Sequence, residues 1–158
     1  MPPKPLHDLK TVNFEQALYD LERIREINPQ RYEFEQLTAV HHFDPENFLI
    51  IGSRDIGEDE FWVRGHVPGN PVFPGVLMLE CAAQLCSVFQ TLHFDSEVFF
   101  GFGGVNNAKF RSTVKPGDKM AIVAKGTSVR ARRSVFSCQG FVGERLVFEA
   151  EIIGVSMG

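Results

Sequence analysis

The feature that most constrains the fold is an apolar segment that runs from Pro74 to His93. After Gly75 it contains no glycine or proline, and its length corresponds to about five helical turns. Apolar residues occupy nearly every face of such a helix, and a helix that is apolar all round is buried. The sequence therefore predicts a central helix around which the rest of the chain is wrapped.

The segments that would wrap this helix read as strands. Phe48–Ile56 and Glu60–His66 are separated by Gly57-Glu58-Asp59, which is a hairpin signal. Four more strands are predicted after the helix, at Glu97–Arg111, Asp118–Lys125, Val129–Val142 and Arg145–Val155. Short connections imply antiparallel neighbours. We therefore expect an α+β fold with a sheet of about six antiparallel strands around one helix.

The N-terminal part is predicted to add a helix over Phe14–Ile27, which Asn13 can cap with Gln16 three residues later. Residues 28–46 are less regular. Their adjacent pair His41-His42 points in two directions on any regular element, which favours packed or solvated histidines over a metal site. A chain of 158 residues fits one domain, 1–158, with residues 1–27 as an N-terminal helical extension.

Composition indicates a cytoplasmic protein. The N-terminal sequence MPPKPLHDLK lacks the apolar region of a secretory signal. The segment 76–89 is short and carries Glu80 and Gln84, so no membrane span is predicted. Cys81, Cys86 and Cys138 have no CxxC spacing and read as reduced, buried thiols.

The net charge of −4 conceals a basic stretch at 109–133, which has eight lysines and arginines against one acid, Asp118. One interpretation is a solvated sheet face. The other is a docking patch for an acidic partner. The basic residues lack interleaved aromatic residues, so nucleic acid is not the expected partner.

A narrow polar stripe crosses the predicted central helix at Glu80, Gln84, Ser87 and Thr91. An ionised carboxylate is costly to bury, so Glu80 must be paired, face a cavity or be protonated. Desolvation would raise its pKa, as suits a general acid near neutral pH. The alternative is that Glu80 binds backbone groups where elements pack.

His66 is predicted to end a strand just before a turn rich in proline, where its side chain can face a cleft. A purely structural histidine is the alternative. Gly75 falls in the first helical turn, where amide N–H groups have no intrahelical acceptor. A base, an acid and an oxyanion donor within one segment fit abstraction of a proton α to a carbonyl, with protonation of a leaving group.

These residues closely resemble the signature of the (3R)-3-hydroxyacyl-[acyl-carrier-protein] dehydratases of the FabZ type, GHFPxxPVxPGVLxxEAxAQ. The positions that match are Gly65, His66, Pro68, Pro71, Val72, Pro74, Gly75, Val76, Leu77, Glu80, Ala83 and Gln84. A second family segment, FxGxDKARFxxxVxPGD, is similar to residues 100–118. The resemblance covers roughly residues 28–156.

The resemblance implies a hot-dog fold and a homodimer, usually assembled into a trimer of dimers, in which His66 of one copy works with Glu80 of the other. His66 would remove the α proton of an acyl thioester carried by acyl carrier protein, and Glu80 would protonate the departing 3-hydroxyl. The Gly75 amide would polarise the thioester carbonyl, and Gln84 would orient Glu80. No metal or redox cofactor is implied.

Further expectations concern the acyl chain and its carrier. The candidates for the lining of an apolar acyl tunnel are Val67, Phe73, Phe99, Phe100 and Phe102, with core packing as the alternative for each phenylalanine. Arg130 and Arg132 are predicted to share one face of a strand and to contact the carrier, with Lys109 or Arg111 nearby.

Three departures from the family pattern bear on the acyl chain rather than on the chemistry. Val67 replaces a phenylalanine, Asn106-Asn107 replaces Asp-Lys, and the entry segment at 28–38 keeps only Arg31 and Phe34. Three other functions remain open: a dehydratase that also isomerises the double bond, a hot-dog thioesterase, and an acyl-binding domain without activity. The isomerising relatives usually have aspartate in place of Glu80, which argues against the first.

Overall fold

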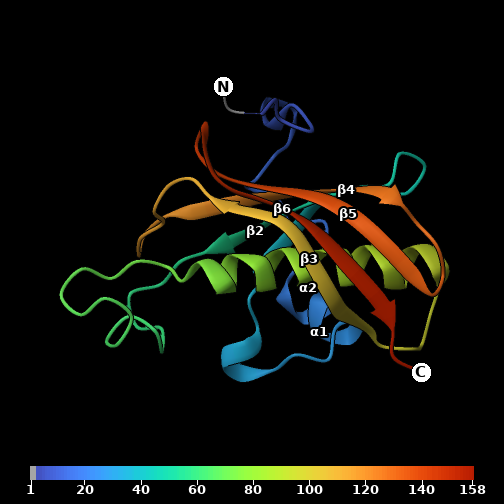
Figure 1. Cartoon of the computed structure of the whole chain (residues 1–158), viewed down its shortest axis with the longest axis horizontal. Helices are drawn as coiled ribbons and strands as arrows, with labels where there is room; N and C mark the ends of the chain where they lie inside the picture. The colour runs from blue at the N-terminus through green and yellow to red at the C-terminus, as the bar shows by residue number, and fades with distance from the viewer. Residues whose placement is uncertain (1–2) are drawn as a thin grey trace.

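The apolar run forms α2, a helix from Gly75 to Phe94, which lies inside a curved sheet in the computed structural model of residues 3–158 (Figure 1). Pro74 occupies the N-cap position, and Asp95 ends the helix in the left-handed conformation with φ 48°. By length and composition α2 could cross a membrane. Its apolar residues instead belong to the core that it shares with the sheet, so α2 is the core helix of the domain.

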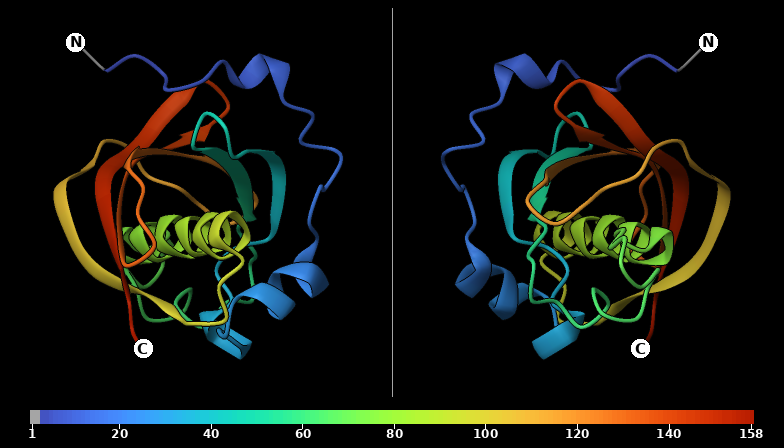
Figure 2. Two further views of the ribbon diagram at one scale, coloured as in Figure 1. Left: turned by 90° about the vertical axis from the view of Figure 1, so that its right-hand side faces the viewer. Right: turned by 90° about the vertical axis from the view of Figure 1, so that its left-hand side faces the viewer.

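The sheet contains six antiparallel strands in the order β1-β2-β4-β5-β6-β3. Their bounds are β1 (Ala39–Asp44), β2 (Leu49–Asp55), β3 (Phe100–Phe110), β4 (Lys119–Ser128), β5 (Arg133–Val142) and β6 (Arg145–Ser156). Viewed along α2, the strands curve over one side of the helix (Figure 2). This is the predicted hot-dog arrangement, with β1 and β3 as the two edge strands.

The core lies between α2 and the concave side of the sheet. Leu85 and Phe89 of α2 belong to the same buried cluster as Ile122, Phe136 and Phe148 of the sheet, and each is fully or almost fully buried. Burying one such side chain contributes about 1.5–3 kcal/mol. This layer therefore fixes α2 against the sheet.

The predicted central helix and the strands after it are confirmed within a few residues, but the predicted hairpin before the helix is wrong. β2 pairs with β1, which the sequence did not predict, through a turn in which the Phe48 N–H donates to the Pro45 carbonyl at 3.3 Å. Residues 60–66 form turns instead of a strand. Their backbone groups bond within the loop, where the Val63 N–H donates to the Glu60 carbonyl at 3.1 Å and the His66 N–H to the Trp62 carbonyl at 2.8 Å. The Glu60 carboxylate also accepts from the Trp62 indole and the Gly57 N–H, which keeps this segment folded on itself.

The predicted N-terminal helix is also shorter than expected. Only Leu21–Ile27 forms a helix, α1, and its cap is Asp20, whose side chain accepts a hydrogen bond from the Arg23 N–H. Phe14 packs on the outer face of the sheet, whereas Ile24 packs in the inner core. One continuous helix cannot place its residues on both sides of a sheet edge, so the chain forms a turn at residues 14–16 and begins the helix only at Leu21.

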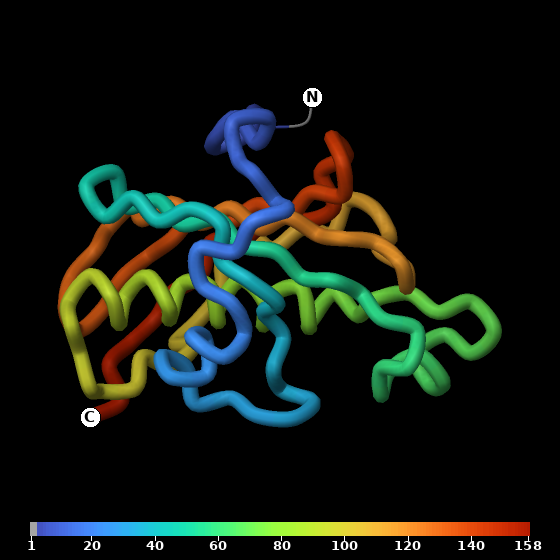
Figure 3. The backbone as a smooth tube through the Cα atoms, turned by 180° about the vertical axis from the view of Figure 1, so that it is seen from behind, coloured from blue at the N-terminus to red at the C-terminus, as the bar shows by residue number. Residues whose placement is uncertain are grey.

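Residues 4–20 form an N-terminal strap that passes around the β1 edge, as Figure 3 shows from behind. The strap contains a short 3-10 helix, η1 (Leu9–Thr11), and a second one, η2 (Tyr32–Phe34), follows α1. The predicted histidine pair is packed beneath the strap. His41 binds the Gln16 carbonyl at 2.6 Å and the Ser53 hydroxyl at 2.7 Å, and His42 stacks on His7.

Candidate active site

His66 lies on a loop of residues 56–74 that joins β2 to α2 and extends beyond the N-terminal end of the helix (Figure 1). It occupies a turn rather than the end of a strand, because its N–H donates to the Trp62 carbonyl at 2.8 Å. Residues 64–70 are exposed. The imidazole is therefore accessible from outside the single chain.

One hydrogen bond determines which nitrogen of the neutral His66 ring carries the hydrogen. His66 Nδ1 lies 2.7 Å from the Val72 carbonyl oxygen. A carbonyl can only accept, so Nδ1 carries the hydrogen in this contact. In the neutral ring Nε2 is then left with a free lone pair, which is the form that a general base needs.

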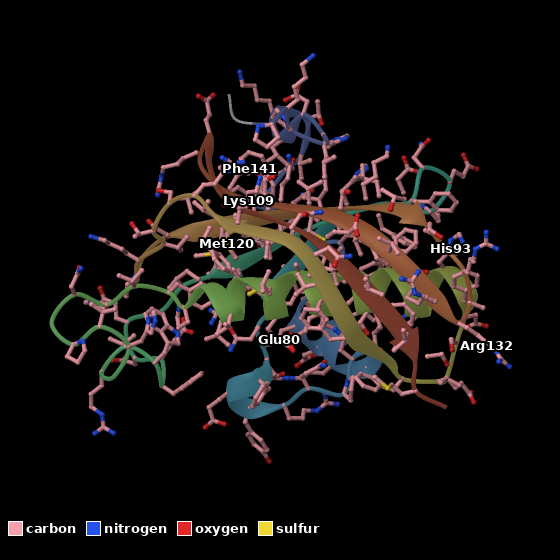
Figure 4. The ribbon with its side chains drawn as sticks, in the orientation of Figure 1. Glu80, His93, Lys109, Met120, Arg132 and Phe141 are labelled. Atoms are coloured by element: carbon pink, nitrogen blue, oxygen red, sulfur yellow. The ribbon has the colours of Figure 1, made fainter. Side chains whose placement is uncertain are left out.

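Glu80 is half-buried on α2, on the side of the helix that faces away from Met120 and the sheet (Figure 4). Its Oε2 atom is buried and has no hydrogen-bond partner among the described residues. Burial raises the pKa of Glu80, and the Gln84 amide one turn later acts in the opposite direction. The carboxyl is thus biased toward its protonated form, as a proton donor requires.

Both the oxygen and the nitrogen of the Gln84 side-chain amide form hydrogen bonds with the segment 34–36. Its Oε1 accepts from the Gln36 N–H at 3.0 Å, and its Nε2 donates to the Phe34 carbonyl at 2.6 Å. Cys81 adds a third link, from its thiol to the Gln36 carbonyl at 3.1 Å. These bonds fix residues 34–36 against α2, one turn from Glu80.

Gly75 begins α2 at a point of close approach to β3. A Cβ atom at this position would lie 2.9 Å from the Phe110 ring, so a larger residue would collide with it. The N–H groups of Leu77 and Met78 donate to the Pro74 carbonyl. The Gly75 N–H has no acceptor in the part of the chain that the structure describes, so it is available to a ligand.

The residues predicted to line the acyl tunnel lie in different environments, some buried and some exposed. Phe73 is buried against Trp62, with ring centroids 5.4 Å apart, and is a core residue of the single chain. Phe99 is 44% exposed, whereas Phe100 is buried, and both line a cavity of about 260 Å³. Phe102 and Val67 are also exposed. The cavity is partly polar, because Ser87, Thr91, Arg25, Glu26 and Arg31 contribute to its wall.

The basic residues form two groups rather than one. Arg130 and Arg132 lie in the turn between β4 and β5, so the prediction that they share a strand face is wrong. The Gln90 side chain, near the C-terminal end of α2, binds the Arg130 carbonyl. Lys109 is at the other end of the sheet, as Figure 4 shows, and Arg111 near it pairs with Glu149. The expectation that Lys109 or Arg111 lies near Arg130 is therefore also wrong.

The structure also places residues around the loop that the sequence did not single out. Arg54, Glu60 and Trp62 form a buried or half-buried polar cluster at the base of the loop. The available signal was a pair of opposite charges, Arg54 and Glu60, flanking a predicted turn. Among residues 3–158, no group of three or more histidine, cysteine, aspartate or glutamate side chains could hold a metal ion. All three cysteines are free and buried, as predicted.

A family model described as a FabA-like domain matches residues 28–151. The chain is 32% identical over 133 residues to the 3-hydroxyacyl-[acyl-carrier-protein] dehydratase FabZ of Lactiplantibacillus plantarum, which covers 82% of this chain and 88% of the relative. It is 34% identical over 139 residues to the protein of the same name from Desulfotalea psychrophila, which covers 85% of this chain and 91% of the relative.

Among solved structures, the chain is similar to the dehydratase heterocomplex ApeI:P from Xenorhabdus doucetiae. The TM-score is 0.74 and the identity 11%, over 85% of this chain and 91% of that chain, so this likeness shows the fold alone. The family match and the identities above 30% show more than the fold. The chain belongs to the FabZ-type 3-hydroxyacyl-[acyl-carrier-protein] dehydratases, a family of hydro-lyases within the FabA-like domains.

Proposed function

We propose that this chain dehydrates (3R)-3-hydroxyacyl-[acyl-carrier-protein] to the trans-2-enoyl thioester in fatty acid biosynthesis. His66 Nε2 removes the α proton, the bond between the β carbon and the hydroxyl oxygen breaks, and Glu80 donates a proton so that water leaves. The observation that carries the proposal is that the chain offers both a base and an acid: His66 Nε2 has a free lone pair, and burial raises the pKa of Glu80.

The developing charge on the thioester oxygen needs a hydrogen-bond donor. The Gly75 N–H has no acceptor within the described chain and lies in the first turn of α2, where the helix dipole favours negative charge. The glycine is required at this position because the Phe110 ring fills the space that a Cβ would occupy. We assign the Gly75 amide to polarisation of the thioester carbonyl.

The site is proposed to be completed by a second copy of the chain. No hydrogen bond joins the side chains of His66 and Glu80 within the residues that the structure describes. The edge strand β3 is largely exposed, and apolar side chains lie exposed on it and beside it: Phe102, Val105, Phe110 and Val76. An open edge with exposed apolar groups favours pairing with another chain. His66 of one copy would then serve Glu80 of the other, with a trimer of dimers as the further assembly.

The carrier is proposed to dock on the turn between β4 and β5. Arg130, Arg132 and Arg133 are exposed there, and none forms an ion pair within residues 3–158. At the other end, Glu149 pairs with Arg111 and Glu151 binds Asn106, which reduces the positive field around Lys109. The dehydration steps require no metal or redox cofactor. The free thiols support a reducing, cytoplasmic setting.

One assay tests the reaction type. The protein is mixed with a (3R)-3-hydroxyacyl thioester, and ultraviolet absorbance of the enoyl thioester is followed together with release of free thiol. We expect absorbance to rise without thiol release. Thiol release without enoyl product would indicate a thioesterase, and binding without either product would indicate an acyl-binding domain; both results contradict the proposal.

A further inference from the structure

Arg54 is a buried cation at the base of the His66 loop. It comes from β2 and is 7% exposed. Its guanidinium donates to both carboxylate oxygens of Glu60 and, at 3.1 Å, to Gln36 Oε1. The same group lies over the Phe73 ring, 5.1 Å from the ring centroid. One side chain thus contacts residues on both sides of the exposed loop.

The Glu60 carboxylate accepts several hydrogen bonds at the base of the loop. Besides Arg54, it accepts from the Gly57 N–H at 2.5 Å and from the Trp62 indole Nε1 at 2.9 Å. Burial alone would raise the pKa of Glu60, but these donors outweigh it, and the pKa is lowered from its usual value. Glu60 is therefore ionised near neutral pH and can hold all of its partners at once.

The two residues held in this way are those that flank His66. Trp62 and Phe73 are 3% and 1% exposed, and their rings pack edge to face. Between them, residues 64–70 are exposed and have little packing of their own. The His66 N–H is bound by the Trp62 carbonyl, and Nδ1 is bound by the carbonyl of Val72, the neighbour of Phe73. The two hydrogen bonds that orient His66 are therefore made to Trp62, one of the two buried aromatic residues, and to Val72, the neighbour of the other.

The same cluster reaches the helix that carries Glu80. Gln36 accepts from Arg54 through its side chain and donates from its backbone N–H to Gln84 Oε1. Gln84 lies one helical turn after Glu80. A continuous set of hydrogen bonds thus runs from the His66 loop through Arg54 and Gln36 to α2.

We propose that Arg54 and Glu60 are positioning residues that set the orientation of the His66 imidazole, by clamping Trp62 and Phe73 on either side of the loop. This inference rests on the proposed function, in which His66 is the base. A buried ion pair is weak evidence for stability, since apolar residues often replace such pairs without loss. Holding a catalytic base in register is a different task, and a displacement of about 1 Å can cost about 100-fold in rate.

The test uses Glu60→Gln in the full chain. This change keeps the shape and an acceptor for the Trp62 indole but removes the charge that holds Arg54. We expect kcat for a short pantetheine-linked 3-hydroxyacyl substrate to fall about 10–100-fold, with KM nearly unchanged. Trp62 is the only tryptophan in the chain, so its emission reports the loop directly. We expect that emission to shift to longer wavelength and to become accessible to acrylamide.

A matched control is Glu149→Gln, which breaks another arginine–glutamate pair, Arg111–Glu149, between the segment after β3 and strand β6, outside the loop. It should leave kcat and Trp62 emission at wild-type values. Arg54→Lys keeps the charge and should retain more activity than Arg54→Gln. If Glu60→Gln does not fold, Trp62→Phe removes the indole N–H bond to Glu60 together with part of the packed ring, and a loss of kcat is expected.

A folded Glu60→Gln with wild-type kcat overturns the proposal, as does a folded Trp62→Phe with wild-type kcat where Glu60→Gln cannot be obtained. An equal loss in Glu149→Gln also overturns it. Failure of the proposed function is a separate result, because it appears in the wild type, as absence of enoyl product, or as full turnover in His66→Ala. The shift in Trp62 emission in Glu60→Gln does not depend on that outcome.

Discussion

At His66 a single hydrogen bond determines which nitrogen can act as the base. Because Nδ1 is engaged by the Val72 carbonyl, Nε2 is the free atom. His66→Ala removes the base and Glu80→Gln removes the acid. We expect each change to lower kcat about 10²–10⁴-fold, while circular dichroism and oligomeric state remain those of the wild type. Near-normal turnover in either folded variant would contradict the assigned roles.

Glu80 also makes a prediction about stability. Its pKa is raised in the folded protein by burial, so the folded state holds the proton more tightly than the unfolded state. The cost of ionising it is absent below the ordinary value of 4.5 and grows as the pH rises through the folded pKa. Chemical denaturation of Glu80→Gln should therefore give a higher free energy of unfolding than wild type at about pH 8. The difference should vanish in acid; a variant that is less stable at both pH values would show that the carboxylate is stabilised by a partner.

At the scale of elements, the loop between β2 and α2 depends on an ionised Glu60. The folded pKa of Glu60 is depressed, so its contribution is fully present above the ordinary value of 4.5 and is lost as the pH falls through the folded value. Trp62 emission should therefore be constant from neutral pH to about 4.5 and change below it, before far-ultraviolet circular dichroism changes. Emission that changes only together with global unfolding would show that the loop has no separate transition.

The proposed docking of the carrier protein on the turn between β4 and β5 can be tested by mutation. Charge reversal at Arg130 and Arg132 should raise KM for a carrier-linked substrate at low salt, because a positive patch raises the encounter rate with an acidic carrier. A short pantetheine-linked substrate should be almost unaffected. Lys109→Glu, at the other end of the sheet, is the matched control and should change KM little. Equal losses with both substrates would assign the arginines a structural role.

At the scale of the whole molecule, the sequence predicted what depends on long uniform patterns. The apolar run predicted α2, and strand-like segments joined by short connections predicted β4, β5 and β6. The motif from Gly65 to Gln84 located the candidate base, acid and oxyanion donor. The wrong strand at 60–66 contains the apolar run Phe61-Trp62-Val63, but the Glu60 side chain before it forms its hydrogen bonds inside the loop. The missed strand β1 contains two adjacent histidines that pack under the N-terminal strap, a long-range contact with no local signal.

Whether His66 and Glu80 act together depends on the assembly of two copies of the chain. His66→Ala and Glu80→Gln are each prepared inactive, mixed, and allowed to exchange subunits, which mass spectrometry verifies. In a mixed dimer one site has both intact residues and the other has neither, and half of the dimers are mixed. Enoyl absorbance should therefore recover to about a quarter of the wild-type rate. No recovery after verified exchange would contradict a site built from His66 of one copy and Glu80 of the other.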